Sequence, residues 1–595
     1  MYKISTLPNL KLIQLTLCLS IGVVCQGWIP TPYIMCLWGA FFFFNPPFTP
    51  RSSIFLACLS ALLILVIMDF STGLHWNRTL FILVHYFIIG SIYFYVRFSL
   101  NSSQRKSLSI VLIVLLLLNC LGSIYQVFLS SEAQPLSWVP EDGINRAFGL
   151  FDNPNLFASS LMMVTFVAIK FWRDRGSSVL PLIFLITTLV LTQSRGAILG
   201  LSLGLTVLFY FDSMRIKAWI MVFGLICLIG FSLVMTNRSL SPTELGVNQR
   251  VELFKGIKNY LESEWLTGSG AGTFHLEYPF YRTLGGKYPL YAHNHILEIW
   301  CELGIAGLIL IIVWIIRGFR LSLYRRRSDP ILLAFATACL VNSCANQSFS
   351  YFVVASLFGI CVALLDENSI LEAPVDICSR AYIWKIGAFF ICALGLYQFQ
   401  WNKLASDSLE NKNLPYMKVA DINIFWKQDS KLYTFFCNQF SDNKEARALL
   451  LSWGKYLKSR YPRESEIVFQ MARLSSKEDD PYKSSMYAYQ ALVLDPYSER
   501  YTAWLMRLEY NRNRNKKVIK LAERVIGSNP QYEGINPWYD KIYELYLSSL
   551  IVEQNGHKAR KLIQTGIRWV DKDFGERVEQ VINQNIELLN PKLKR

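Results

Sequence analysis

Two histidines stand where the longest polar segment of the chain gives way to an apolar run. They belong to the stretch Ala-His-Asn-His that contains His293, Asn294 and His295, and Glu298 and Glu302 follow. The unperturbed pKa of histidine is about 6.5, so an imidazole can remove a proton from a hydroxyl near neutral pH. The same pair could instead cap the start of a helix. It could also bind a metal together with Glu298, although the sequence supplies no convincing further ligand.

Three arginines upstream of the histidines are candidate functional residues, because polar residues in or beside a membrane are costly. Arg195 lies in Thr-Gln-Ser-Arg-Gly between two apolar runs, Arg250 precedes an amphipathic stretch at 251–262, and Arg146 precedes an Asn-Pro-Asn sequence that predicts a helix start. The planar guanidinium fork suits phosphate and keeps its charge. Arg195 could simply anchor a turn. Its expected position at the outer interface, against the usual bias of positive residues, favours a function.

A glycine-rich segment, Gly-Ser-Gly-Ala-Gly at 268–272, separates Arg250 from the histidines. A phosphate-binding P-loop would require a Lys-Ser or Lys-Thr pair after the glycines, and this segment has none. We therefore interpret it as a flexible or sharply turning loop.

The composition indicates a polytopic membrane protein. Hydrophobic residues make up 52% of the 595 residues and charged residues only 17%, and the apolar residues form long uninterrupted runs. The net charge of +16 does not indicate nucleic-acid binding, because the basic residues cluster in short loops between apolar runs, as the positive-inside rule predicts. Twelve of the 13 cysteines lie in the first 400 residues, and their spacing suggests neither a disulfide framework nor a zinc ribbon.

The apolar runs predict an all-α transmembrane domain over residues 1–400 with about 12 or 13 spanning helices. The expected spans are 9–27, 31–44, 52–69, 78–98, 107–126, 153–171, 177–193, 197–211, 217–235, 296–316, 329–346, 348–366 and 382–400. The short basic loops fall on one side, which is the cytoplasm. The longer segments at 127–152, 236–295 and 401–595 are then expected on the extracytoplasmic side.

Residues 401–595 differ in character, because charged residues become frequent and the apolar residues take helical spacing. Pro462, Pro496 and Pro530 recur every 34 residues, which is the period of tetratricopeptide repeats. Ala488 and Ala522 each precede a proline by eight residues, where a small residue lets paired helices pack closely. We predict a soluble helical-repeat domain of the tetratricopeptide type with a concave surface for a protein partner.

The order of the motifs in the first domain resembles the O-antigen ligase superfamily. This superfamily includes the O-antigen ligases, the Wzy-type polymerases and the O-linked protein oligosaccharyltransferases. The matching segments are the Arg-to-Asn-Pro-Asn stretch, the Ser-Arg-Gly turn, the long loop that begins near Arg250, the Gly-x-Gly-x-Gly sequence and His-Asn-x-x-Leu-x-x-x-x-Glu-x-Gly-x-x-Gly. Together they span roughly residues 140–310.

This resemblance implies a metal-independent glycosyltransferase of a bacterial inner membrane that requires no cofactor. Such an enzyme moves a glycan from a polyprenyl (undecaprenyl) diphosphate carrier to an acceptor hydroxyl on the extracytoplasmic side. The acceptor can be a lipid, a protein or a glycan. Attack opposite the departing diphosphate would invert the anomeric centre.

The resemblance also implies roles for single residues. Arg195 and Arg250, with Arg146 as a weaker third, would bind the diphosphate. His293, which stands in the His-Asn position, would be the base or would position the acceptor. The supporting residues implied around it are Asn294, His295 and Glu302.

Several functional alternatives remain open from the sequence. A ligase or oligosaccharyltransferase is favoured over a polymerase, because a helical-repeat domain on the active side could recruit a protein acceptor or partner. A lipid-carrier transporter or flippase would place charged residues along a midplane path in broken helices, whereas here they gather at one interface. A non-catalytic scaffold would leave the interfacial arginines and histidines without a role.

Overall fold

The structure is a computed structural model that describes part of the chain. The described residues are 15, 89–128, 146–151, 153–176, 178–211, 245–283, 291–325, 330–366, 430–526, 537–555, 557–559 and 562. Five predicted spans, at 9–27, 31–44, 52–69, 217–235 and 382–400, and most of the one at 78–98 lie outside these residues, apart from Leu15.

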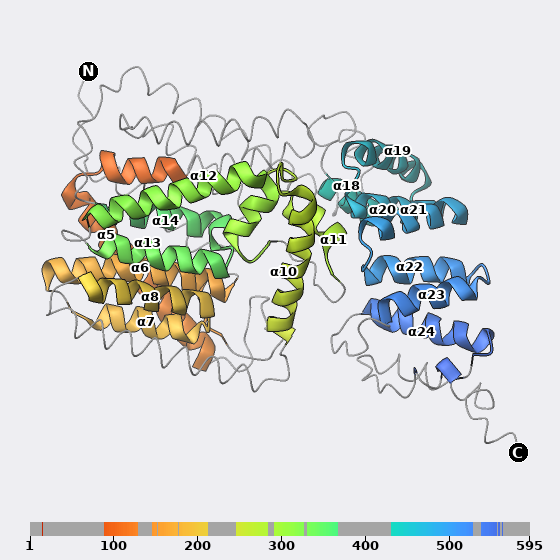
Figure 1. The fold of residues 1–595 in the computed structure, drawn as a ribbon, viewed down its shortest axis with the longest axis horizontal. Coiled ribbons are helices and arrows are strands. Elements are labelled where there is room, and N and C mark those ends of the chain that lie inside the picture. Colours follow the sequence, from red (N-terminus) through yellow and green to blue (C-terminus); the bar gives the residue numbers. More distant parts are fainter. Residues whose placement is uncertain are drawn as a thin grey trace, which may run out of the picture. The chain divides into compact units, whose positions relative to one another are not determined.

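Every regular secondary-structure element in the described part of the chain is a helix. Seven of them lie at predicted spans (Figure 1): α5 (Ser102–Phe128), α6 (Pro154–Arg175), α7 (Leu180–Leu191), α8 (Arg195–Phe211), α12 (His295–Arg325), α13 (Pro330–Ala345) and α14 (Phe352–Leu365). Three of these contain stretches long and apolar enough to cross a membrane, at Ser102–Val127, Pro154–Arg175 and His295–Val313. The predicted all-α, multi-pass architecture is confirmed for these residues.

The start of α6 illustrates how the sequence sets a helix boundary. The side chain of Asn153 accepts a hydrogen bond from the backbone N–H of Asn155, and Pro154 occupies the first helical position. At the other end, Gly176 has a φ of 58°, and its N–H bonds to the carbonyl of Trp172. The predicted Asn-Pro helix start is therefore confirmed.

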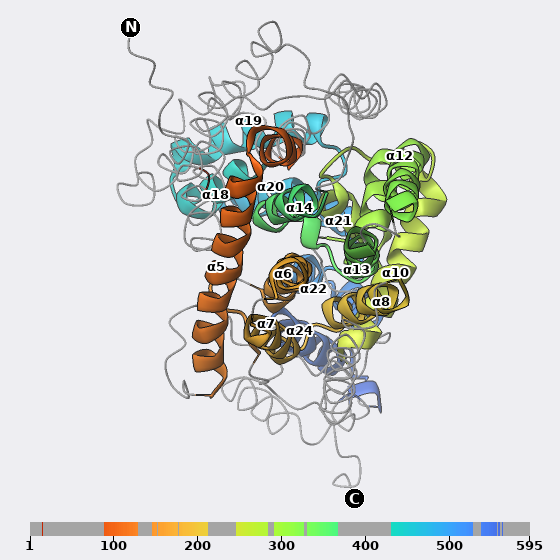
Figure 2. The same cartoon turned by 90° about the vertical axis from the view of Figure 1, so that its left-hand side faces the viewer.

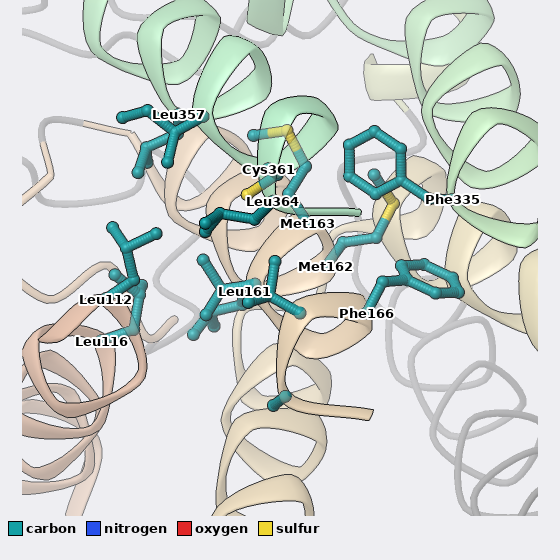
Figure 3. Close-up of a cluster of buried hydrophobic side chains, with 14 of the residues drawn as sticks. Leu112, Leu116, Leu161, Met162, Met163, Phe166, Phe335, Leu357, Cys361 and Leu364 are labelled. Carbon is teal, nitrogen blue, oxygen red and sulfur yellow. The ribbon is translucent and has the colours of Figure 1, made fainter. Parts of the chain in front are cut away.

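Helix α6 is the centre of the membrane domain. All its residues from 156 to 170 are buried, and it contacts α5, α7, α8, α13 and α14, which surround it in Figure 2. Figure 3 shows this core. Its side chains come from α5 (Leu112, Leu116), α6 (Leu161, Met162, Met163, Phe166), α13 (Phe335) and α14 (Leu357, Cys361, Leu364). By contrast, α5 leaves Leu118, Leu121 and Tyr125 more than half exposed, as a lipid-facing helix would.

A row of glycines lets α8 approach α13 closely. Gly196, Gly200 and Gly204 are spaced four residues apart, so they lie along one face of α8. A Cβ atom on Gly200 would lie 2.7 Å from the carbonyl oxygen of Ala338, and one on Gly204 would lie 2.7 Å from that of Ala334. Small residues at this spacing are the usual means by which membrane helices pack backbone against backbone.

Gly200→Leu is therefore expected to destabilise the membrane domain. The new side chain meets backbone atoms of α13, so the two helices must separate, at a cost of about 1–3 kcal/mol or more. Thermal unfolding of the detergent-solubilised protein measures this as a lower midpoint. Gly122→Leu on α5 is the control, because a Cβ atom there meets nothing within 4 Å. Equal midpoints for the two variants would contradict the packing argument.

The chain divides into two compact units. The first comprises residues 1–246, 264–272 and 291–403, and the second comprises 247–263, 273–290 and 404–595. The second unit therefore takes in most of the long predicted outer loop. Its helices are α10 (Leu245–Glu264, of which 247–263 belong to this unit), α11 (Phe274–Tyr281), α18 (Ser430–Phe440), α19 (Lys444–Arg460), α20 (Ser465–Lys477), α21 (Pro481–Leu494), α22 (Glu499–Tyr510), α23 (Asn515–Ile526) and α24 (Pro537–Val552).

The helices α18–α24, called here the C-terminal helical domain, pack in sequence order, each on the next or the next but one. Helices α19 and α21 end shortly before Pro462 and Pro496, and Pro530 lies outside the described residues. Ala488 on α21 and Ala522 on α23 are fully buried, which suits the close helix contact expected of them. Assignment of this domain to the tetratricopeptide type remains a prediction.

Candidate active site

Three residues, Thr192 to Ser194, connect α7 to α8, and Arg195 and Gly196 of the predicted Ser-Arg-Gly turn belong to α8 itself. Helix α7 ends at Leu191 and α8 begins at Arg195, so the Arg195 guanidinium belongs to the first turn of a helix, where backbone N–H groups are unpaired and the dipole attracts anions. Three buried side-chain atoms here have no hydrogen-bond partner within the described structure: Gln193 Oε1, Ser194 Oγ and Arg195 Nε. Buried polar atoms are normally paired, so this turn offers unmet hydrogen-bonding capacity to a ligand.

Arg146 holds this turn against the start of α6. Its Nε donates to the carbonyl oxygen of Thr192 at 2.8 Å, and an Nη donates to Asn155 Oδ1 at 3.1 Å. The N–H of Ala147 also bonds to the carbonyl of Leu191. The structure therefore brings Arg146 to the Arg195 turn, where two of its donors help to fix the turn.

A buried amide and hydroxyl network lies next to the same turn, and sequence reasoning missed it. Asn342 on α13 donates to Ser159 Oγ on α6 at 2.9 Å, and Ser159 Oγ lies 2.6 Å from Ser348 Oγ. Asn346 donates to Asn342 Oδ1 at 2.9 Å, and a Cβ atom on Gly196 would lie 2.7 Å from Asn346 Nδ2. Burying an amide side chain in an apolar helix is costly, so Asn342 and Asn346 could have been recognised in the sequence as candidate functional residues.

The histidine segment begins α12 and is fixed by Asn294. The Oδ1 atom of Asn294 accepts from the N–H groups of Ile296 and Leu297, both at 3.1 Å, so Asn294 caps the helix. Its Nδ2 donates to the carbonyl of Cys344 on α13 at 3.1 Å. His293 has a φ of 52°, a left-handed conformation that residues other than glycine adopt mainly where the surroundings enforce it.

Glu298 and Ser350 connect His295 to the segment between α13 and α14. Buried Glu298 accepts from the N–H of Ala292 and from Ser350 Oγ, both at 3.1 Å, and Ser350 Oγ lies 3.4 Å from His295 Nδ1. Since Ser350 donates its proton to Glu298, it accepts one from His295. This arrangement favours the Nδ1–H tautomer, in which Nε2 is the proton acceptor.

No group of three or more His, Cys, Asp or Glu side chains within the described ranges is placed to hold a metal ion. Glu298 was considered from the sequence as a metal ligand with the two histidines. Nothing in the local sequence indicated a functional role for Ser350, because it lies in a short polar stretch between two apolar runs.

Glu302 fastens the glycine-rich segment to α12. Its Oε2 accepts from the N–H of Gly272, and its carbonyl accepts from the N–H of Gly270, both at 2.8 Å. At Gly304, where φ is 63° and ψ is −160°, α12 is kinked, and a Cβ atom on Gly268 would collide with the backbone of Glu302. The glycine-rich segment is therefore a sharp turn that packs against α12. This is one of the two forms expected from the sequence, a flexible loop or a sharply turning one.

Arg250 lies in the second compact unit and is exposed. Helix α10 begins at Leu245, so the prediction that Arg250 precedes the helix was wrong, and the residue lies within its first turns. The apolar pattern begins only at Val251, whereas the helix continues N-terminally through residues without that pattern.

Within the first compact unit, the polar contacts of several motifs meet near one end of α13. They run from Arg146 through Asn155 and Ser159 to Asn342 at the end of α13. The histidine segment contacts the same end of α13 through Asn294. It also contacts the segment between α13 and α14, where His295 lies close to Ser350. Three motifs singled out in the sequence, around Arg146, Arg195 and His295, therefore meet around the α13–α14 connection.

Comparison with known protein families gives a match. Residues 180–312 match the family model described as O-Antigen ligase. This segment runs from α7 into α12 and contains Arg195, Arg250 and His293, whereas Arg146 and the C-terminal helical domain lie outside it. No curated protein matches the chain. The resemblance drawn from the motifs is confirmed over this segment, and residues 180–312 form a domain of the O-antigen ligase superfamily.

Proposed function

We propose that the chain is a membrane glycosyltransferase of the O-antigen ligase type. It would move a glycan from a polyprenyl (undecaprenyl) diphosphate to an acceptor hydroxyl on the extracytoplasmic side, without a metal ion. The family domain indicates, more broadly, an enzyme that transfers or polymerises glycans from a lipid-linked donor at a membrane. The finer proposal rests on the buried, unpartnered polar atoms of Gln193, Ser194 and Arg195 at the start of α8.

The start of α8 has the donors that a diphosphate needs. Arg195 Nε and Ser194 Oγ can donate to phosphate oxygens, and the helix dipole adds a favourable potential. Gln193 Oε1 is an acceptor, which suits a hydroxyl of the first sugar. Arg250 supplies a second guanidinium, and Arg146 supports the turn rather than binding the diphosphate by itself.

The reaction would be a single displacement at the anomeric carbon. The acceptor oxygen forms a bond to this carbon while the bond from the carbon to the diphosphate oxygen breaks. The acceptor proton goes to the imidazole of His293, and polyprenyl diphosphate leaves with its negative charge stabilised by the arginines. Asn294 caps the helix that follows His293, and His295 and Glu302 would have supporting roles nearby.

Ser350→Ala is expected to lower kcat about threefold to thirtyfold and to leave the KM for the donor nearly unchanged, because it releases His295 and Glu298 without touching the α8 turn. Steady-state transfer kinetics of the purified protein measure this split. Ser202→Ala is the matched control, since its hydroxyl bonds only to the carbonyl of Ile198 in its own helix. A wild-type kcat in the Ser350→Ala variant would show that Ser350 has no role in the proposed reaction.

An in vitro transfer assay tests the proposal. Purified full-length protein is given a polyprenyl-diphosphate glycan and one of three acceptors: lipid A core, a pilin-like protein or a second molecule of the donor. Transfer to the lipid supports a ligase, transfer to the protein supports an oligosaccharyltransferase, and elongation of the donor supports a Wzy-type polymerase. Failure with every acceptor, although the donor binds, would contradict the proposal and favour a lipid-carrier transporter.

A further inference from the structure

In the second compact unit, α10 and α11 are held together by aromatic side chains. The ring of Tyr260 on α10 stacks on that of Tyr281 on α11 with centroids 4.6 Å apart, and it lies 6.1 Å from the ring of Phe274 on α11. Gly256 on α10 leaves room for Tyr278 of α11, because a Cβ atom on Gly256 would lie 2.6 Å from the hydroxyl of Tyr278. The position of α11 is therefore tied to that of α10.

A buried ion pair joins the end of α11 to the C-terminal helical domain. Arg282 follows α11 and Asp495 follows α21, and their Nε and Oδ1 atoms lie 2.8 Å apart. The two side chains are only 5% and 3% exposed. Burial raises the pKa of Asp495 and the Arg282 charge opposes that rise, so the Asp495 charge depends on its partner.

A second arginine of the C-terminal helical domain reinforces the contact. Arg463, between α19 and α20, donates to the hydroxyl of Tyr281 at 3.1 Å and lies 3.4 Å from a carboxylate oxygen of buried Glu277. Helix α11 is thus bound to the C-terminal helical domain at two points.

The contact continues from Arg282 to the first turns of α10. Thr283, the next residue, donates to Glu252 Oε2 at 2.7 Å and lies 3.2 Å from the carbonyl oxygen of Glu252. Glu252 is two residues after Arg250 in the same helix. An unbroken series of close contacts therefore leads from Asp495 through Arg282, Thr283 and Glu252 to the part of α10 that carries Arg250.

We propose that Asp495 and Arg282 are positioning residues for Arg250, so that the C-terminal helical domain takes part in binding the lipid-linked diphosphate donor. The inference rests on the proposed function of Arg250. It also places the C-terminal helical domain on the same side of the membrane as α10 and α11, because a buried ion pair cannot form across a bilayer.

The test separates positioning from stability by removing the ion pair in two steps. Arg282→Met leaves a buried carboxylate unpaired and is expected to lower the midpoint of thermal unfolding. The double variant Arg282→Met/Asp495→Leu removes both charges and is expected to recover that midpoint. The KM for the donor is expected to stay about tenfold to a hundredfold above wild type in the double variant, with kcat changed little, because α10 has lost its anchor.

Two further variants complete the experiment. Thr283→Val breaks the contact with Glu252 and leaves the ion pair intact, so it is expected to raise the KM for the donor with an unchanged unfolding midpoint. Arg500→Met is the matched control, because Arg500 pairs with Glu466 inside the C-terminal helical domain. It is expected to keep the wild-type KM for the donor.

The possible failures are distinguishable. If the double variant and Thr283→Val both keep the wild-type KM for the donor while Arg250→Ala raises it, the positioning inference is wrong and the proposed function stands. If Arg250→Ala itself keeps the wild-type KM, the role of Arg250 in the proposed function is wrong.

A labelling measurement checks the shared side without using activity. Phe280 on α11 and Tyr482 on α21 are 40% and 75% exposed, so single Phe280→Cys and Tyr482→Cys variants present thiols to solvent. A membrane-impermeant maleimide added to intact spheroplasts is expected to label both variants above the wild-type background. The inference would be overturned if the thiol of one variant were labelled only in intact spheroplasts and the thiol of the other only in inverted vesicles.

Discussion

Replacing Arg195 by lysine is expected to lower kcat/KM for the donor about tenfold to a hundredfold, which corresponds to one lost charge-assisted hydrogen bond of about 1.5–3 kcal/mol. The lysine keeps the positive charge at the start of α8 but presents a point charge in place of a planar fork. Because Arg195 Nε is buried and unpartnered in the described structure, its hydrogen-bonding capacity is available to the diphosphate. Transfer kinetics over a range of donor concentrations measure the effect.

Arg250→Lys is expected to show a loss of similar size, because Arg250 is the other arginine proposed to bind the diphosphate. Arg175→Lys is the control, since Arg175 lies exposed in the last turn of α6 over the ring of Phe171. Wild-type turnover in either Arg195→Lys or Arg250→Lys would remove that arginine from the mechanism. Equal losses in the Arg175→Lys control would show that the assay reports expression or folding instead.

Replacing His293 by alanine is expected to lower kcat about 10²- to 10⁴-fold, the usual contribution of general base catalysis, while donor binding persists. The physical reason is that the acceptor hydroxyl loses the group that takes its proton, whereas the arginines and the α8 turn remain intact. Single-turnover transfer with bound donor measures this loss directly, and binding of labelled donor to the same preparation supplies the reference.

His295→Ala is the informative comparison for that variant. The structure connects His295 to Ser350 and Glu298, which favours a supporting role, so its loss of kcat is expected to be smaller than that of His293→Ala. If His293→Ala keeps full activity and His295→Ala loses it, the base is His295, whose Nε2 the Ser350 contact leaves as the proton acceptor.

The sequence predicts the membrane helices well because their signal is local. Long apolar runs marked α5, α6 and α12, and the Asn-Pro pair marked the start of α6. The close pair of apolar runs near residue 346 proved to be two helices, α13 and α14, separated by a short polar segment. The glycines of α8 recur every four residues, a spacing that can be recognised in the sequence.

The buried network of the candidate site could not be read in the same way. Ser159 and Asn342 bond although 183 residues separate them in the chain, and no local pattern pairs a serine on one helix with an amide on another. The cost of burying an amide in an apolar helix does identify Asn342 and Asn346 as unusual. It cannot identify their partners, which depend on how α6, α8 and α13 pack.

The contact of α11 with the C-terminal helical domain was equally beyond sequence reasoning. Arg282 and Asp495 are ordinary charged residues at helix ends, and only the fold shows that both are buried. The 34-residue spacing of prolines marked the ends of α19 and α21, but it gave no sign that the end of α21 would contact the end of α11.

The most direct test of the central claim measures donor binding and glycan transfer in one preparation, with EDTA present throughout. Wild type, Arg195→Ala and His293→Ala are compared at equal amounts of folded protein. The account predicts that wild type binds and transfers, that Arg195→Ala does neither, and that His293→Ala binds the donor but does not transfer the glycan. Wild-type binding by Arg195→Ala, or wild-type transfer by both His293→Ala and His295→Ala, would contradict it.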